Sequence, residues 1–229
     1  KRFSKAPARL EDLPAIDAVV ISHDHYDHLE KETVVFLSKQ GAVFFVPAGV
    51  GEYLTKWGVP TSRIRELSWW EESRFEALTF ICVPARHFSG RGLLDRNETL
   101  WAGWIVRSET KSLYYSGDTG YANHFAAIGE RCGPFDLTMI KIGAYNDAWP
   151  YVHLDPEQAV KAHAELRGKV LLPVHWGTFI LALHPWDEPV MRLVKAAKQN
   201  DVRIVTPMIG ELVDIDKPDA SRQWWEEVK

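Results

Sequence analysis

The chain has 229 residues, of which 46% are hydrophobic, enough to bury a substantial core in one domain. Its formal net charge is −4 with scattered Lys and Arg residues, so it lacks the basic face of a nucleic-acid-binding protein, and no apolar run reaches the roughly 18 to 20 residues of a membrane-spanning helix. The two cysteines, Cys82 and Cys132, cannot make a disulfide framework and fit a reducing, cytoplasmic compartment.

Short apolar runs alternate with amphipathic segments, which favours an α/β fold built in layers. The predicted strands cover residues 16–22, 43–46, 78–83, 100–107, 112–115, 137–142 and 170–174. The predicted helices cover residues 32–40, 51–57, 155–166 and 187–200, with a glycine just after each of the first two and a proline near the start of each of the last two. Because no repeat or linker interrupts the pattern, residues 1–229 are predicted to form a single domain.

A dense group of metal-binding residue types directly follows the strand predicted at 16–22: His23, His25, Asp27 and His28. Four such donors from one tight turn cannot all fit one tetrahedral ion, but two adjacent metals can share them. Residues two apart on an extended segment point the same way, so His23 and His25 suit one metal. Asp27 and His28 then suit a second. The alternative is a polar surface loop with coincidental histidines.

Three further donors each lie just past a predicted strand. His87 follows the strand at 78–83, Asp118 lies in a glycine-flanked turn after 112–115, and His175 follows 170–174. Taken singly, each would more often be an ordinary loop, turn or core residue. Together with the first cluster they make seven candidate ligands, which predicts a shared metal pocket at the rim of a sheet.

The order H-x-H-x-D-H, then a lone His, an Asp and a final His, resembles the metallo-β-lactamase superfamily. The resemblance implies an αββα sandwich in which one zinc is held by His23, His25 and His87. It implies a second zinc on Asp27, His28 and His175, with Asp118 bridging the two Zn²⁺ ions. His25 stands where the flavo-diiron branch has a Glu, which favours zinc over a redox iron pair.

A closer resemblance is to the N-acyl-phosphatidylethanolamine-hydrolysing phospholipase D family, from about residue 1 to residue 184. It implies a zinc phosphodiesterase that releases an N-acylethanolamine and phosphatidic acid. That family tends to have Asn at the non-ligand position of Asp24. It also has several strands before the segment matching Lys1, so we expect this chain to lack its N-terminal strands and to be part of a longer protein. The motifs that carry the resemblance are SHDHYDHL, LSWWEE, SGDTGY, GPFDL, IGAY, HLDPEQAV and HWGTF.

Two residues are predicted to act on the substrate's protons. His153 lies just before Asp155, the N-cap of a predicted helix, and is our candidate proton donor or phosphate positioner; the resembling family also has a His there. Its alternative is a cap-region residue with no catalytic role. Asp27 can move protons while it binds metal.

Aromatic side chains are the candidates for the pocket wall. Tyr145, Tyr121 and Trp176 are predicted to bind substrate, although core packing explains them equally well. The remaining histidines are interpreted as ordinary residues: His124 and His163 lie within helical patterns, and His184 lies in a loop.

Several alternatives stay open at this point. A lactonase or another small-molecule ester hydrolase could use the same metals, whereas an RNA-processing nuclease would need a basic exosite. A non-catalytic zinc-stabilised binding domain needs only four ligands. A lipid substrate requires access from a bilayer, so peripheral membrane contact is open, and Trp224 and Trp225 could provide that surface or dock on the fold. The sequence does not choose between a monomer and a homodimer.

Overall fold

The computed structural model describes residues 2, 6–217 and 222–228, and its strands form two sheets. The first sheet is parallel, with the order β1 (Ala18–Val20), β2 (Val43–Pro47) and β3 (Ile64–Leu67). Helix α1 (Lys31–Gln40) connects β1 to β2, and helix α2 (Gly51–Lys56) lies between β2 and β3. As predicted, α1 ends at Gly41, whose φ of 108° is a left-handed conformation that glycine adopts readily.

The second sheet has six strands in chain order, with antiparallel pairing from β4 to β7 and parallel pairing from β7 to β9. Helices α3 and α4 connect its parallel strands, and α5 follows the sheet. These strands are β4 (Glu72–Phe75), β5 (Leu78–Val83), β6 (Gly103–Arg107), β7 (Ser112–Tyr115), β8 (Phe135–Lys141) and β9 (Gly168–Val174). The helices are α3 (His124–Cys132), α4 (Pro156–Glu165) and α5 (Glu188–Gln199), and single 3-10 turns cover Leu10–Asp12, Thr61–Arg63 and Trp224–Glu226.

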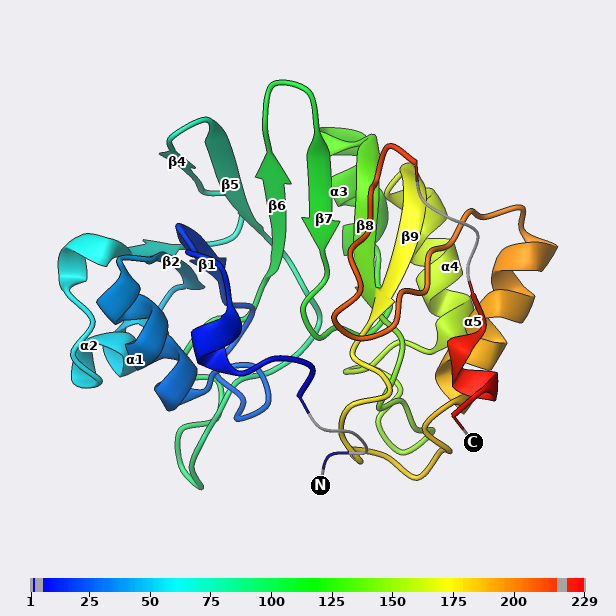
Figure 1. Cartoon of the computed structure of the whole chain (residues 1–229), viewed down its shortest axis with the longest axis horizontal. Coiled ribbons are helices and arrows are strands. Elements are labelled where there is room, and N and C mark those ends of the chain that lie inside the picture. The colour runs from blue at the N-terminus through cyan, green and yellow to red at the C-terminus, as the bar shows by residue number, and fades with distance from the viewer. Residues whose placement is uncertain (1, 3–5, 218–221, 229) are drawn as a thin grey trace.

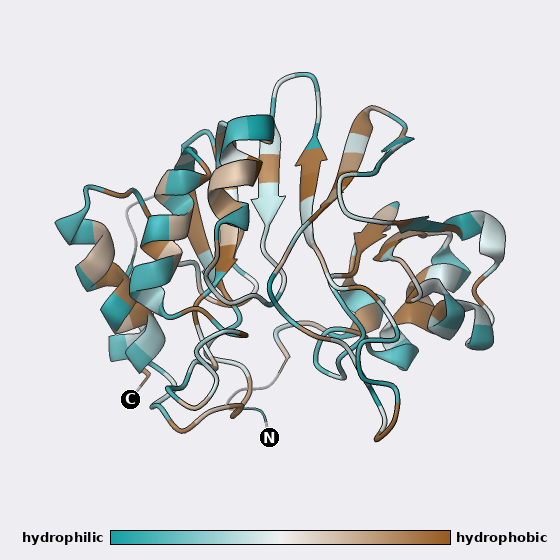
Figure 2. Cartoon of the chain, turned by 180° about the vertical axis from the view of Figure 1, so that it is seen from behind, coloured by the Kyte–Doolittle hydropathy of each residue, from teal (hydrophilic) through white to brown (hydrophobic). Residues whose placement is uncertain are grey.

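The buried side chains divide into clusters that define four layers. Phe44 on β2 packs with residues of α1 and α2, whereas its neighbour Phe45 faces Phe80 and Trp104 of the second sheet. The other face of the second sheet, which includes Ile81, packs against α3, α4 and α5. Figure 1 shows these helices on opposite sides of the two sheets, and Figure 2 shows hydrophobic colour concentrated on the strands. The predicted αββα sandwich is confirmed.

Two strands were not predicted from the sequence. Both β3 and β4 are only four residues long and lie at the edges of their sheets. Edge strands carry charged residues because one side stays in contact with solvent, and these two read IREL and ESRF. An apolar pattern therefore could not reveal them. The predicted strand at 100–107 is also shorter, since its ladder begins at Gly103.

The C-terminal tryptophan pair is part of the core. Trp224 is 7% exposed and Trp225 is fully buried. The Trp224 indole stacks on Trp176 and donates a hydrogen bond to the carbonyl of Thr206 at 3.1 Å. Of the two alternatives left by the sequence, docking on the fold is therefore correct. None of the helices in the described ranges has both the length and the apolar character needed to span a bilayer.

Candidate metal centre

The predicted donors come from strand ends that meet at one edge of the molecule. Strands β5, β7, β8 and β9 run in the same direction, since β5 is separated from β7 by two antiparallel pairings and the last three strands are parallel. Their carboxyl ends therefore lie at one edge, where His87, Asp118 and His175 follow β5, β7 and β9. The turn after β1 brings the cluster of residues 23–28 to the same place.

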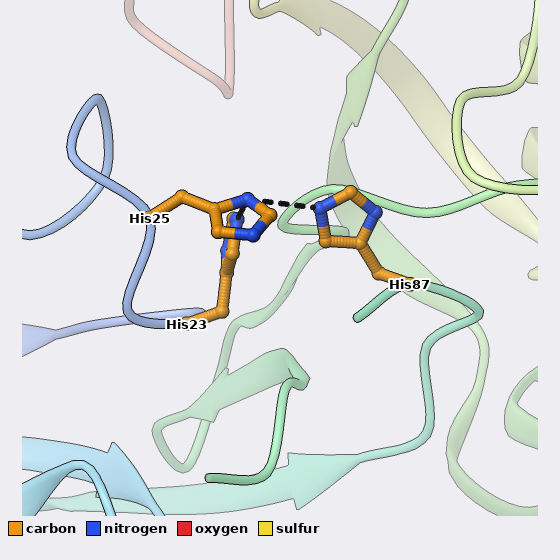
Figure 3. A group of neighbouring side chains, drawn as sticks. All are labelled: His23, His25 and His87. Atoms are coloured by element: carbon orange, nitrogen blue, oxygen red, sulfur yellow. Dashed lines mark hydrogen bonds between the residues drawn. The ribbon is translucent and has the colours of Figure 1, made fainter. Parts of the chain in front are cut away.

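Three imidazoles form the first half of this centre. The Nε2 of His23 lies 2.9 Å from the Nδ1 of His25, and the Nε2 of His87 lies 3.3 Å from that same Nδ1 (Figure 3). His87 is 62 residues away from His25 in the sequence. One ring nitrogen of each of the three side chains thus lies within 4.8 Å of the other two.

The second half contains two carboxylates and two imidazoles. The Oδ2 of Asp27 lies 3.4 Å from the Nε2 of both His28 and His175. The Oδ2 of Asp118 lies 3.4 Å from the Nε2 of His28, 3.3 Å from that of His175 and 3.9 Å from that of His87. Asp118 thus contacts members of both halves. The structure brings all seven predicted ligand residues together; their role as ligands stays a prediction.

Several buried polar atoms of this cluster have no hydrogen-bond partner. They include the Nε2 of His28, the Oδ1 of Asp118 and both ring nitrogens of His175. Leaving one such atom unpaired costs about 1–3 kcal/mol, so several in one place require another explanation. Imidazole nitrogen and carboxylate oxygen are good zinc donors, and a bound cation satisfies them. These residues therefore fit a pair of divalent cations.

The surrounding hydrogen bonds orient the donors. His87 donates from Nδ1 to the carbonyl of Val152 at 3.1 Å, which leaves its Nε2 lone pair facing His25. The Nδ1 of His23 lies 3.0 Å from the hydroxyl of Ser22. Asp24 is fully buried, but its carboxylate accepts from the amide of Gly90 and the hydroxyl of Thr99, at 2.8 and 3.1 Å. Asp24 is thus a structural residue, as its non-ligand position implied.

Burial and close contact shift the ionisation of these groups. Burial lowers the pKa of His23 well below its usual value and lowers the pKa of His87 to about 4. Burial also lowers the pKa of His28, but the facing Asp118 carboxylate raises it well above the usual value. Burial raises the pKa of Asp118, yet His175 and His28 hold it well below its usual range. A cation binds neutral imidazole and ionised carboxylate, so at neutral pH His23, His87 and Asp118 are in the binding state, whereas His28 must release a proton when a cation binds.

Local backbone geometry aims two of these side chains. A Cβ on Gly117 would lie 2.6 Å from the Cβ of Ser22, so only glycine fits the turn that presents Asp118. His175 has a φ of 60°, a left-handed conformation that is uncommon outside glycine and asparagine. Such backbone conformations concentrate at functional sites.

His153 reaches the same centre from the segment after β8. Its Nε2 lies 3.8 Å from the Oδ2 of Asp118, and its Nδ1 is buried without a partner. Burial lowers the pKa of His153 to about 2, and the charge of Lys141 adds to this effect. His153 also stands next to Leu154 and the capping box of α4, in which Asp155 accepts from the amide of Gln158 at 2.8 Å. The structure places the predicted residue beside the candidate ligands.

A cavity of about 250 Å³ opens beside Asp27, His28 and His175. Trp176 lines it, whereas Tyr145 and Tyr121 are not among its lining residues, and substrate binding by these residues stays a prediction. The Tyr145 ring stacks on His184 and its hydroxyl donates to Glu188 at 2.6 Å; the Tyr121 hydroxyl donates to Glu165 on α4. The other walls include Tyr115, Ala144, Phe179, Ile180, Leu181, Ala182, His184 and Trp186.

Sequence reasoning missed three features around the centre. Tyr115 lines the cavity from the last position of β7, where it read as an ordinary strand residue. The loop after β9 forms most of the wall, and loops carry no periodic pattern that would reveal this. Lys141 is fully buried next to the segments that carry the site. Its signal was available: a lone charge inside the apolar strand predicted at 137–142.

Comparison with known proteins extends these observations. A family model described as the beta-lactamase superfamily domain matches residues 1–176. An uncharacterized protein of Mycobacterium tuberculosis is 52% identical, covering 98% of this chain and 61% of that protein. N-acyl-phosphatidylethanolamine-hydrolyzing phospholipase D 1 of Caenorhabditis elegans is 37% identical, covering 93% of this chain and 64% of that protein. The chain thus spans about three fifths of the length of these curated relatives.

Among solved structures, the fold is similar to that of Igni18, a metallo hydrolase from the archaeon Ignicoccus hospitalis. The TM-score is 0.67 at 24% identity, and the match covers 86% of this chain and 78% of the archaeal protein. At this identity the likeness concerns the fold alone.

Proposed function

The chain belongs to the beta-lactamase superfamily, and from this premise we propose that it is a zinc-dependent hydrolase, specifically a phosphodiesterase of phospholipase D type that acts on N-acyl phosphatidylethanolamine-like lipids. The observation that carries the proposal is the direct contact between the donor cluster and a cavity whose wall includes Trp176, Phe179 and Ile180. Asp27, His28 and His175 belong to both. The named phospholipase relative supports the choice of substrate class.

The donor set supports two zinc ions. His23, His25 and His87 would hold one, Asp27, His28 and His175 the other, and Asp118 would contact both. Two divalent cations supply Lewis acidity at a phosphoryl oxygen and a nucleophilic water at neutral pH.

The chain's own residues orient the substrate and move its protons. In hydrolysis, water adds to phosphorus, the bond to the N-acylethanolamine oxygen breaks, and that oxygen takes up a proton. Because the pKa of His153 is about 2, its ring is neutral, and an N–H at Nε2, 3.8 Å from Asp118, would position a phosphoryl or leaving-group oxygen by a hydrogen bond. Asp27 accepts the proton of the attacking water and passes it to the leaving oxygen. The apolar wall of Trp176, Phe179 and Ile180 binds the acyl chain and excludes water.

Exposed apolar side chains near this edge support a peripheral membrane contact. Leu93, Leu94 and Leu183 are 100%, 94% and 91% exposed. Figure 1 shows the loop between β5 and β6 and the loop after β9 extending from the same end of the molecule. Exposed apolar tips on loops beside a lipid site favour insertion at a bilayer surface. In sedimentation with phosphatidylcholine vesicles, the protein should pellet, and the double variant Leu93→Ser, Leu94→Ser should stay in solution; equal pelleting would remove this contact.

The proposal is tested with the full chain, loaded with zinc and desalted. Metal analysis should return about two zinc ions per chain. The protein should then release N-acylethanolamine from vesicles containing N-acyl phosphatidylethanolamine, as followed by mass spectrometry, and chelation should abolish this release. Bis-p-nitrophenyl phosphate serves as a generic phosphodiester and an acyl lactone as the competing substrate.

Each outcome selects one of the alternatives. Hydrolysis of the lactone without hydrolysis of either phosphodiester would replace the proposal with a lactonase on the same metals. Zinc binding without turnover of any ester would indicate a binding domain. Iron rather than zinc after purification from cells would overturn the assignment of the metal.

A further inference from the structure

Lys141 is a charged residue among apolar neighbours, and the mechanism above gives it no part. It is the last residue of β8, between Ile140 and Ile142, and all three side chains are fully buried. Removing an ammonium from water is costly unless its N–H groups find partners. The partners of its N–H groups therefore show which parts of the fold this buried charge connects.

The ammonium of Lys141 donates to two backbone carbonyls, those of Gly143 and Leu154, the second at 3.4 Å. Its own backbone amide donates to the hydroxyl of Ser116 at 3.1 Å, two residues before Asp118. Burial lowers the pKa of Lys141 to about 7, and the carboxylates of Asp118 and Asp155 oppose this shift. One side chain thus joins two segments that are eleven residues apart in the sequence.

The first segment lies against His175. A Cβ on Gly143 would lie 2.2 Å from the carbonyl oxygen of His175, so the two backbones are in direct contact. The amide of Ile142 donates to the carbonyl of Val174 at 3.0 Å. The bond from Lys141 to Gly143 therefore fixes the backbone behind His175.

The second segment carries His153. The amide of Leu154 donates to the carbonyl of Thr119 at 2.9 Å, and the carbonyl of Val152 accepts from His87 at 3.1 Å. His153 lies between these two anchored residues, with its ring centroid 5.7 Å from that of His175. The bond from Lys141 to Leu154 therefore holds the residue next to His153.

We propose that Lys141 is a positioning residue of the metal centre, whose ammonium joins the backbone of Gly143 to that of Leu154 and so sets where His153 stands relative to Asp118 and His175. It touches neither substrate nor metal. Its effect on turnover rests on the proposed function, whereas its effect on the geometry of His153 does not.

The test compares Lys141→Met with Thr138→Val on the same strand. Met has similar length and no N–H donors, and Thr138 is equally buried but contacts His163, away from the centre. In zinc-loaded protein, Lys141→Met should shift the ring-nitrogen NMR signals of His153, assigned with His153→Gln. It should also lower kcat by about 10-fold while KM stays within about twofold, because positioning errors act on the chemical step. Thr138→Val should shift only the signals of His163 and leave kcat unchanged.

The proposal is overturned if Lys141→Met leaves the His153 signals in place, or if Thr138→Val shifts them equally. Should Lys141→Met fail to fold, Lys141→Gln, which keeps two N–H donors, takes its place. If neither folds, Lys141 serves folding and the proposal is wrong. Wild-type protein that hydrolyses no lipid would refute the proposed function, and the NMR comparison would still decide the role of Lys141.

Discussion

Two regions of this molecule contain deeply buried histidines with the same ionisation. At the metal centre, burial lowers the pKa of His87 to about 4. In the core between β8 and α4, burial lowers the pKa of His163 to about 4 as well. The neighbours differ. The Nε2 of His87 faces His25 and Asp118, whereas His163 shares a hydrogen bond of 2.7 Å with the hydroxyl of Thr138.

This difference shows that burial and a shifted pKa do not by themselves identify a functional histidine. The core has one imidazole with one satisfied partner. The metal centre has several imidazoles and two carboxylates whose donor atoms lie within 4.8 Å of one another in overlapping groups. Some of those atoms, including both ring nitrogens of His175, have no hydrogen-bond partner. Convergence of unsatisfied donors is therefore the feature that separates the two regions.

The largest expected effect would follow from removing the carboxylate that contacts both halves. Asp118→Asn keeps the shape of the side chain but loses the charge that faces His28 and His175. We expect loss of bound zinc and a fall in turnover on the order of 10⁴-fold, as for other residues that act as one unit. Atomic absorption and the vesicle assay measure both quantities.

Asp24→Asn is the matched control, since Asp24 is also buried and its carboxylate accepts hydrogen bonds from Gly90 and Thr99. It should keep its zinc and most of its turnover. Equal losses in the two variants would show that loss of any buried carboxylate near the centre has this effect, and the special role of Asp118 would be refuted.

His153→Ala should have the next largest effect. We expect zinc to be retained and turnover to fall by about 10²-fold, the scale for loss of one hydrogen-bond donor to the reacting oxygen. His163→Gln, in the core, should leave turnover unchanged at a temperature where both proteins are folded. Unchanged turnover in His153→Ala would show that His153, like His163, has no role in the mechanism.

The smallest effect concerns stability in the core. The folded pKa of His163 is about 4 against 6.5 in the unfolded chain, so between these values the unfolded state binds more protons. The stability linked to neutral His163 is thus full above pH 6.5 and is lost as the pH falls towards 4. From pH 7 to pH 5, wild type should lose about 2 kcal/mol more unfolding free energy than His163→Gln.

Urea unfolding of metal-free protein at the two pH values measures this difference. The contributions of the other histidines to the pH dependence are the same in both proteins and cancel. A wild type and a His163→Gln variant with parallel pH dependence would contradict the assignment of a buried, neutral His163.

The four donors that lie close together in the sequence could be predicted as a cluster because local geometry decides their positions. His23, His25, Asp27 and His28 lie within six residues after a strand, and no arrangement of the rest of the chain can separate them by more than a short turn. Most strands were also predictable from apolar runs. The edge strands β3 and β4 were not, because solvent contact replaces that pattern with charges.

The sequence by itself determined the chemistry of the donors and the motif that gathers four of them, because both depend on residue type and on neighbours along the chain. Only the tertiary structure decided that His87, Asp118 and His175 meet that motif, that Tyr121 turns to Glu165 instead of the cavity, and that Lys141 lies beneath the site. These outcomes depend on which strands pair and in which register, and non-local pairing is fixed by the packing of the whole core.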